Sequence, residues 1–257
     1  MCKLKFRLLL SALWLITYQQ FAVGQDTSNP NIDFIHMDLE VSFDTLEGKV
    51  LGKVALDFIN DISDIDSILL HGVSMQYSSV KLNGEEVRYK VNPKTIILYP
   101  NNALQKAQHT LEIEYSCNPR KGIFFIGWND KTGLSQRQIW TQGQGIDHRY
   151  WIPHFDEQTD KLTIDAKINF NKDYEVISNG TLENKTSSGR LNTWHYKMTK
   201  PMSSYLFMIA IGKYDKVETF SKTKIPLTQY YYPKHRGRYE WTYYQNEKIF
   251  DFLEREI

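Results

Sequence analysis

The feature that most constrains this 257-residue chain is a strict alternation of apolar and polar side chains, which returns several times along the sequence. Shorter instances occupy residues 37–43, 50–58 and 111–115. The longest instance places its apolar side chains at Leu162, Ile164, Ala166, Ile168 and Phe170. Successive side chains of a strand point to opposite faces, so a period of two predicts strands with one face on a core and the other in water.

Turn signals separate these segments and favour antiparallel connections. Asn83-Gly84 stands between two short β-like runs, and both residues accept the positive φ angles of a type I′ hairpin turn. Further short strands are expected at 96–99, 122–127, 175–178 and 193–198. Many strands without a helical period predict a mainly β fold, an antiparallel domain of saddle or sandwich-like form.

The pattern changes near the end of the chain. From Tyr239 onward, apolar side chains fall near helical spacing, which predicts an amphipathic helix. The pattern reaches Ile257 without a Gly, Asn or Pro stop signal. We therefore expect a β domain over residues 25–214, followed at 215–257 by the helical start of a second domain that is truncated.

The first 24 residues have the order of a secretory signal peptide. Three basic residues precede an apolar run at 8–16, and Ala22-Val23-Gly24 places small residues before Gln25. A membrane anchor is the alternative, but a spanning helix needs roughly 20 apolar residues. We expect cleavage before Gln25, export to the periplasm or the extracellular space, and no stable membrane anchor.

Charge and cysteine usage exclude several classes. The chain has 31 basic and 30 acidic side chains, a net charge of +1, which argues against a nucleic-acid partner. Removal of the leader takes Cys2 and leaves Cys117 alone, so neither an internal disulfide nor a thiolate zinc cluster is expected. The fold must then rest on its apolar core.

The most informative stretch begins at Thr141. Gly143 and Gly145 allow a ligand or another backbone to approach closely, and the amides of Gln142 and Gln144 supply donors and acceptors.

A second group of polar residues follows at once. Arg149 and Asp156 are expected to pair, with Pro153 stiffening the turn between them. Chemistry alone favours a polar loop held by a partly buried Arg–Asp pair, with a ligand site as the alternative.

This stretch resembles the aminopeptidase N and leukotriene hydrolase family of zinc peptidases. The family pattern is Gln-x-Glu/Gln-Ala/Gly, then Arg-x-x-x-Pro-Cys-x-Asp-x-Pro-x-x-Lys. The sequence departs from it at His154, where Cys is usual, and at Gln158, where Pro is usual. The matching residues are Gln142, Gln144, Gly145, Arg149, Pro153, Asp156 and Lys161.

Three further segments agree with the family in the same order. They are the Gly122–Phe125 strand, the Ser178-Asn179-Gly180 turn, and Pro201-Met202-Ser203-Ser204-Tyr205-Leu206-Phe207, which leads into a strand ending at Tyr214. The resemblance covers roughly residues 32–257, and four segments in one order make it specific.

The resemblance implies a β domain that folds over a zinc-bearing catalytic domain. It implies that Gln144 faces the free α-amine of a peptide substrate, with Gln142 and Gly145 also at the substrate. An α-ammonium that leaves water needs acceptors, and a Gln offers a neutral carbonyl where a Glu would offer a stronger, charge-assisted bond. In the family a Glu of a Gly-x-Met-Glu-Asn motif meets the remaining charge, and this sequence lacks that motif.

The residues for zinc catalysis are missing as well. A peptidase of this class needs His-Glu-x-x-His on a helix, and no two of the seven histidines lie four apart. A metal site at His148 and His154 is the weaker interpretation, because lone histidines are usually structural or solvated. We expect zinc only in the complete parent protein, with no metal site and no catalytic residue in this chain.

The favoured function is therefore the substrate-side, N-terminal portion of an exported zinc aminopeptidase that removes amino-terminal residues from peptides. In this hypothesis residues 215–257 begin the catalytic domain, and the chain alone is inactive. The alternatives are a stand-alone β domain that binds peptides or proteins, and a structural surface protein of sandwich type. The nucleotide sequence past Ile257 would distinguish the first hypothesis from the second.

Overall fold

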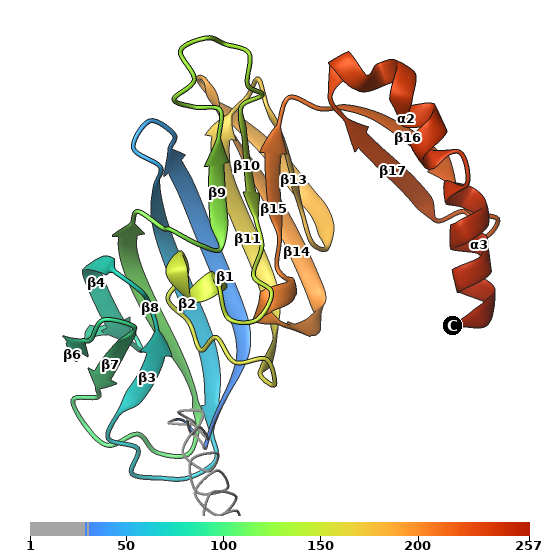
Figure 1. Cartoon of the computed structure of the whole chain (residues 1–257). Helices are drawn as coiled ribbons and strands as arrows, with labels where there is room; N and C mark the ends of the chain where they lie inside the picture. The colour runs from blue at the N-terminus through green and yellow to red at the C-terminus, as the bar shows by residue number, and fades with distance from the viewer. Residues whose placement is uncertain (1–28, 30) are drawn as a thin grey trace, which may run out of the picture. The chain divides into compact units, whose positions relative to one another are not determined.

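The structure, a computed structural model, describes Asn29 and residues 31–257 (Figure 1). The expected signal peptide at 1–24 and the expected start at Gln25 lie outside the described residues. No helix among the described residues is both long enough and apolar enough to cross a membrane.

An eight-stranded sheet forms the larger layer, in the order β13-β14-β11-β1-β2-β8-β4-β5 (Figure 1). Its strands are β1 (Ile32–Asp44), β2 (Lys49–Asn60), β4 (Met75–Leu82), β5 (Glu85–Glu86), β8 (Gln108–Cys117), β11 (Lys161–Asn171), β13 (Thr181–Ser188) and β14 (Leu191–Ser203). The expected mainly antiparallel β fold is confirmed, with one exception: β1 and β11 pair in parallel. Alternation could not reveal this, because parallel and antiparallel strands share the same side-chain period.

Two smaller sheets form a second layer on one face of the large sheet. One has the order β12-β15-β10-β9 and the other β3-β7-β6. Their strands are β3 (Ile68–His71), β6 (Arg88–Val91), β7 (Thr95–Tyr99), β9 (Ile123–Ile126), β10 (Gln138–Thr141), β12 (Glu175–Ser178) and β15 (Ile209–Gly212). Buried side chains from all three sheets make one core, and the Tyr196 hydroxyl of β14 donates to the Val176 carbonyl of β12 at 2.7 Å.

The predicted alternation is what builds this core. Every apolar position of the 162–170 run is buried, as the sequence predicts. Trp151, Trp194, Phe34 and Phe58 are each at most 1% exposed. A fully buried side chain of this kind contributes about 1.5–3 kcal/mol, so the core provides most of the driving force for folding.

The hairpin predicted at Asn83-Gly84 is also confirmed. Asn83 has φ of 53° and Gly84 has φ of 83°, between paired residues of β4 and β5. Two successive positive φ angles are what a type I′ turn requires.

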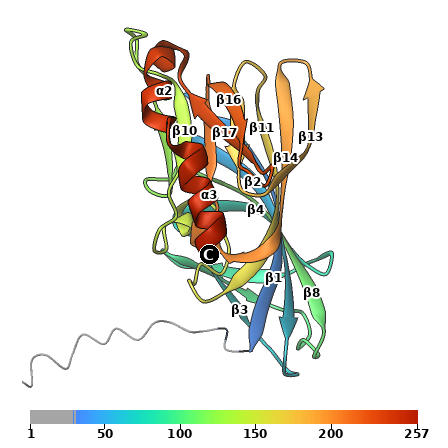
Figure 2. The same cartoon turned by 90° about the vertical axis from the view of Figure 1, so that its right-hand side faces the viewer.

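The C-terminal segment differs in detail from the expectation. It begins with a hairpin of β16 (Asp215–Phe220) and β17 (Pro226–Tyr231), which the sequence pattern did not predict. The expected single helix is divided into α2 (Arg236–Tyr243) and α3 (Asn246–Glu256), with a break at residues 244–245 (Figure 2). Aromatic and β-branched residues at 242–244 have low helix propensity, which accounts for the break.

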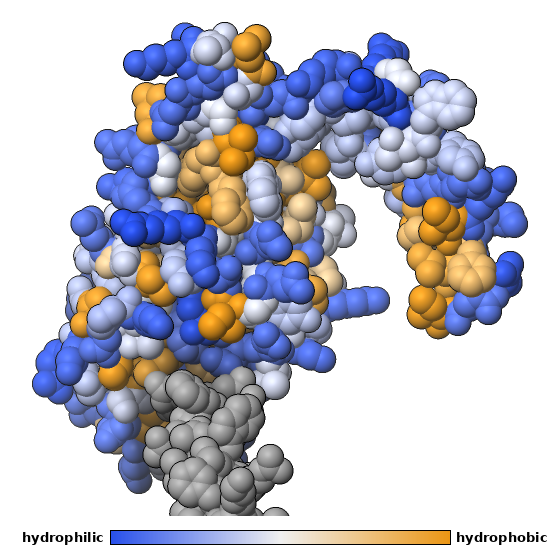
Figure 3. All heavy atoms as spheres, in the orientation of Figure 1, coloured by the Kyte–Doolittle hydropathy of each residue, from blue (hydrophilic) through white to orange (hydrophobic). Residues whose placement is uncertain are grey.

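Neither of these helices contains a buried residue. Ile249, Phe252 and Leu253 of α3 are exposed, and Figure 3 shows apolar side chains gathered on this helix. The boundary expected at residue 214 stays a prediction.

Candidate functional site

The candidate site lies in the connection between β10 and β11. Two parts of this connection make up the site, and we call them the amide loop (residues 142–147) and the anchor segment (residues 148–156). The anchor segment begins with a short 3₁₀ helix, η1 (His148–Tyr150).

The anchor segment is organised around the Asp156 carboxylate, whose side chain is 1% exposed. Its Oδ2 accepts hydrogen bonds from the backbone N–H of Arg149 at 3.1 Å and from Arg149 Nε at 3.2 Å. Its Oδ1 accepts one from Ser204 Oγ at 2.9 Å. Burial acts to raise the pKa of Asp156, but His154, Ser204 and Arg149 outweigh burial and hold that pKa below its usual range. The expected Arg149–Asp156 pair is therefore present, and the carboxylate is ionised.

Two histidines connect the anchor segment to strand β3. The backbones of His71 and His154 exchange hydrogen bonds of 2.8 and 3.1 Å, and His71 Nδ1 accepts the Asp156 N–H at 3.1 Å. Burial, and then the Arg149 charge, lowers the pKa of His71 to about 4. His154, at the position of the family's Cys, donates from Nδ1 to the Ile152 carbonyl, and its Nε2 lies 3.2 Å from Asp156 Oδ1 without hydrogen-bond alignment.

The amide loop has the opposite character. The side chains of Gln142 and Gln144 are exposed, and the Gln142 N–H donates to the Gly122 carbonyl at 2.9 Å. Gly145 has φ of +85°, a conformation that favours glycine. Gln158, where the family has Pro, approaches the Gly145 carbonyl with Nε2 at 3.4 Å.

The separate motif segments meet around this connection. A Cβ at Gly122 would lie 2.1 Å from the Asp147 carbonyl oxygen, so the two backbones touch. Asn179 accepts the Met208 N–H at 2.6 Å and donates to the Leu206 carbonyl at 3.2 Å. The segments that are spread over the sequence thus form one contact network.

The structure does not bring every predicted site residue together. Arg149, Pro153 and Asp156 lie in the anchor segment, where Pro153 and Asp156 are buried. Lys161 is the exposed first residue of β11, opposite Ser203 of β14. His148 and His154 do not form the considered metal pair, because their ring nitrogens contact other groups.

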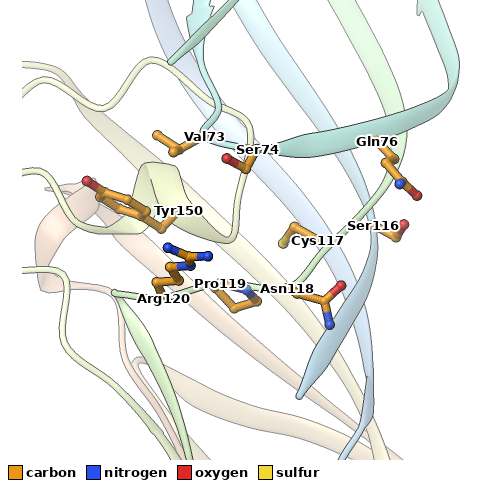
Figure 4. A pocket seen from close by; sticks show the side chains of 9 residues that line it. All are labelled: Val73, Ser74, Gln76, Ser116, Cys117, Asn118, Pro119, Arg120 and Tyr150. Atoms are coloured by element: carbon orange, nitrogen blue, oxygen red, sulfur yellow. The ribbon is translucent and has the colours of Figure 1, made fainter. Parts of the chain in front are cut away.

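A pocket of about 500 Å³ lies beside η1 (Figure 4). Its lining comes from three parts of the chain, which is why sequence reasoning missed it: Val73, Ser74, Gln76, Ser116, Cys117, Asn118, Pro119, Arg120 and Tyr150. Burial raises the pKa of the Cys117 thiol to about 12, so the thiol stays neutral and is a poor nucleophile. The other polar lining residues offer hydrogen-bond donors and acceptors to a ligand.

The described part of the chain was also compared with the requirements of a metal site. Among the described residues, no three His, Cys, Asp or Glu side chains are grouped so as to hold a metal ion. The donor set of a catalytic zinc, three protein ligands with an open fourth position, therefore does not fit this part of the chain.

The sequence profile of the Peptidase M1 N-terminal domain matches residues 30–206. Glutamyl aminopeptidase of Bos taurus is 30% identical over 236 residues, which cover 86% of this chain and 25% of that protein. Probable aminopeptidase 2 of Sulfurisphaera tokodaii is 25% identical over 192 residues, 73% of this chain and 23% of that protein. The chain thus spans about a quarter of the length of these curated relatives.

Solved structures show the same fold. The M1 zinc metallopeptidase from Deinococcus radiodurans superposes with a TM-score of 0.66 at 16% identity, over 79% of this chain and 48% of that one. A variant of a two-domain M1 zinc metallopeptidase bound to L-tryptophan gives a TM-score of 0.64 at 17% identity, over 78% and 47%. With its motif segments, its two-layer β fold and the profile match in agreement, the chain belongs to the Peptidase M1 N-terminal domain family.

Proposed function

We propose that this chain is the substrate-side β domain of an exported, zinc-dependent aminopeptidase, and that Gln144 binds the free α-amine of the peptide substrate. The observation that carries the proposal is the contrast at residues 142–156. Two exposed amides stand on a loop that a largely buried segment, hydrogen-bonded around the Asp156 carboxylate, holds in place.

The chemistry of the loop suits this role. The Gln144 side chain makes no hydrogen bond to another described residue, so its carbonyl is available to an ammonium group. An α-ammonium that leaves water without acceptors loses on the order of 1–3 kcal/mol or more. Gln142 lies on the same loop, and the lack of a side chain at Gly145, directly after Gln144, leaves room for a ligand backbone.

Zinc would be held by a catalytic domain outside this chain. The matching relatives are more than three times as long as this chain, and the described residues supply no ligand set. A bound zinc polarises the scissile carbonyl and activates water in peptidases of this type. The β domain would then contribute amine recognition, and the chain alone would not turn over substrate.

The experiment compares the 257-residue chain with the protein produced from the intact gene. Zinc content and hydrolysis of an aminoacyl reporter are measured for both, with and without a chelator. We expect about one zinc and chelator-sensitive hydrolysis in the gene product and neither in the chain alone. A zinc-loaded, active chain would contradict the proposal.

A gene that stops at Ile257 without encoding a zinc motif would favour the alternative, a stand-alone peptide-binding β domain. Titration of the chain with peptides that carry a free or an acetylated amine would then test that alternative directly.

Export is tested separately. Mass spectrometry of secreted material should find a mature terminus at Gln25, and a product that retains Met1 would contradict export.

A further inference from the structure

His148 stands at the junction of three segments. It opens η1 directly after the amide loop and is 1% exposed. Its Nε2 lies 2.7 Å from the Phe207 carbonyl oxygen, which belongs to the segment before β15. Its Nδ1 lies 2.8 Å from Trp151 Nε1 in the anchor segment.

These two contacts fix the tautomer of the ring. The indole N–H of Trp151 can only donate, so Nδ1 of His148 must accept and carries no proton. The Phe207 carbonyl can only accept, so the proton of the neutral ring sits on Nε2. A second proton on Nδ1 would remove the acceptor for Trp151 and would place a charge in the core.

The same ring lies directly against the amide loop. A Cβ added at Gly143 would be 2.1 Å from His148 Nε2 and 2.3 Å from Cδ2, closer than nonbonded atoms approach. The φ angle of Gly143 is not in the left-handed region, so this glycine is required by the ring rather than by the backbone. Gly145, in contrast, has φ of +85°, and a Cβ added there would meet no atom within 4 Å.

We infer that neutral His148 is a positioning residue that sets the place of the amide loop, and that protonation of His148 releases the loop. The link to substrate amine recognition rests on the proposed function, whereas the effect on the loop itself does not. Besides burial, three groups act on protonation of the ring: His154 disfavours the charged form, whereas the Phe207 carbonyl and Asp156 favour it. Burial is the largest influence and brings the pKa of His148 to about 4.

The first test is an acid titration of the wild-type chain by NMR, from pH 7.5 to pH 3.5, without ligand. The Trp151 indole N–H signal should shift as its acceptor is lost, and protection of the Gln142 amide against exchange should fall by roughly tenfold or more. The Trp128 indole is the internal control, because it donates to the Gln138 carbonyl at 2.9 Å and has no titrating partner. A Trp151 signal that does not change, or one that changes only together with Trp128, would overturn the inference.

The second test is a double-mutant cycle of Gly143→Ala with His148→Ala. In the wild-type background Gly143→Ala should lower protection of the Gln142 and Asp147 amides by roughly tenfold, and in the His148→Ala background by less than about twofold. Gly145→Ala is the matched control, because its backbone strain should cost the same in both backgrounds. Additive effects of Gly143→Ala and His148→Ala would overturn the inference.

These measurements need no substrate and no zinc, so they separate the two proposals. If the loop responds as described while Gln144→Ala leaves the kinetics of the gene product intact, amine recognition fails and the positioning role stands. If the loop does not respond but Gln144→Ala impairs turnover, the positioning role fails and the proposed function stands.

Discussion

The amide loop and the anchor segment are adjacent in sequence and belong to the same family motif, yet their environments are opposite. Asp156 is 1% exposed, and its carboxylate accepts three hydrogen bonds from Arg149 and Ser204. Gln144 is exposed, and its side chain makes no hydrogen bond to another described residue. One motif therefore contains both buried, hydrogen-bonded residues and exposed residues without partners. The spacing of the motif residues in the sequence does not show which residue is of which kind.

This difference predicts which property, stability or activity, a substitution in each part should change. A buried carboxylate with several partners contributes to folding, because removing it leaves those partners unpaired. An exposed amide without partners contributes almost nothing to folding, so a requirement for it would point to a ligand. The comparison predicts that stability and activity respond to different halves of the motif.

The largest effect on stability is expected for Asp156→Ala. It leaves the Arg149 guanidinium, 11% exposed, without its carboxylate, and should lower the free energy of unfolding by about 3–5 kcal/mol. Urea denaturation of the chain measures the change. Glu157→Gln is the matched control, because Glu157 is 21% exposed and approaches the same guanidinium only to 3.6 Å. Equal losses from the two substitutions would break the comparison.

Acidification should also destabilise the anchor segment. The pKa values of His71 and His148 are lowered to about 4, so the unfolded chain binds more protons than the folded one between about pH 6.5 and pH 4. Stability from these two residues is therefore fully present above pH 6.5 and is lost as the pH falls towards 4. Denaturation midpoints measured from pH 7.5 to pH 4.5 should decrease.

Asp160 should oppose this acid loss. Its pKa is raised to about 7, first by burial and then by Asp33, so the folded chain holds a proton there that the unfolded chain releases. The contribution of Asp160 to the stability of the folded chain is present at low pH and is lost as the pH rises through 7. Asp160→Asn should make the decrease below pH 6.5 steeper, whereas an unchanged slope would show that Asp160 does not titrate in this range.

A smaller effect is expected for Ser204→Ala. This substitution removes the hydrogen bond to Asp156 Oδ1 but keeps both bonds from Arg149, so the free energy of unfolding should fall by about 1–2 kcal/mol. Thermal melts of the two proteins measure it. Ser78→Ala, on an exposed hydroxyl whose bond to the Glu114 carbonyl is 3.3 Å, should change little.

The smallest effect on stability, within about 0.5 kcal/mol, is expected for Gln144→Ala. In the enzyme produced from the intact gene, the same substitution should lower kcat/KM for substrates with a free amine by roughly tenfold, on the order of 1.5 kcal/mol. A lower melting temperature with unchanged kinetics would assign Gln144 to the structural half of the motif and remove the proposed amine contact.

Much of the fold could be predicted from the sequence because strand formation is local. The alternation at 162–170 was sufficient to predict a strand there. The tolerance of Asn83-Gly84 for positive φ was sufficient to predict the hairpin turn. The β16–β17 hairpin and the break between α2 and α3 were not predicted, because their patterns are short and their propensities weak. The parallel pairing of β1 with β11 depends on which distant strand packs beside β1. The local sequence pattern of either strand does not contain that information.

For the candidate site, the sequence by itself determined the residue types and their order, since charge, amide chemistry and glycine freedom are properties of single residues. It predicted the Arg149–Asp156 pair, which the structure confirmed. Only the tertiary structure decided which of these side chains are buried, because burial depends on what packs from elsewhere. His71, Ser204 and Phe207 come from remote parts of the chain, and their contacts make one half of the motif structural. The requirement for Gly143 likewise comes from the His148 ring, a contact that no spacing rule contains.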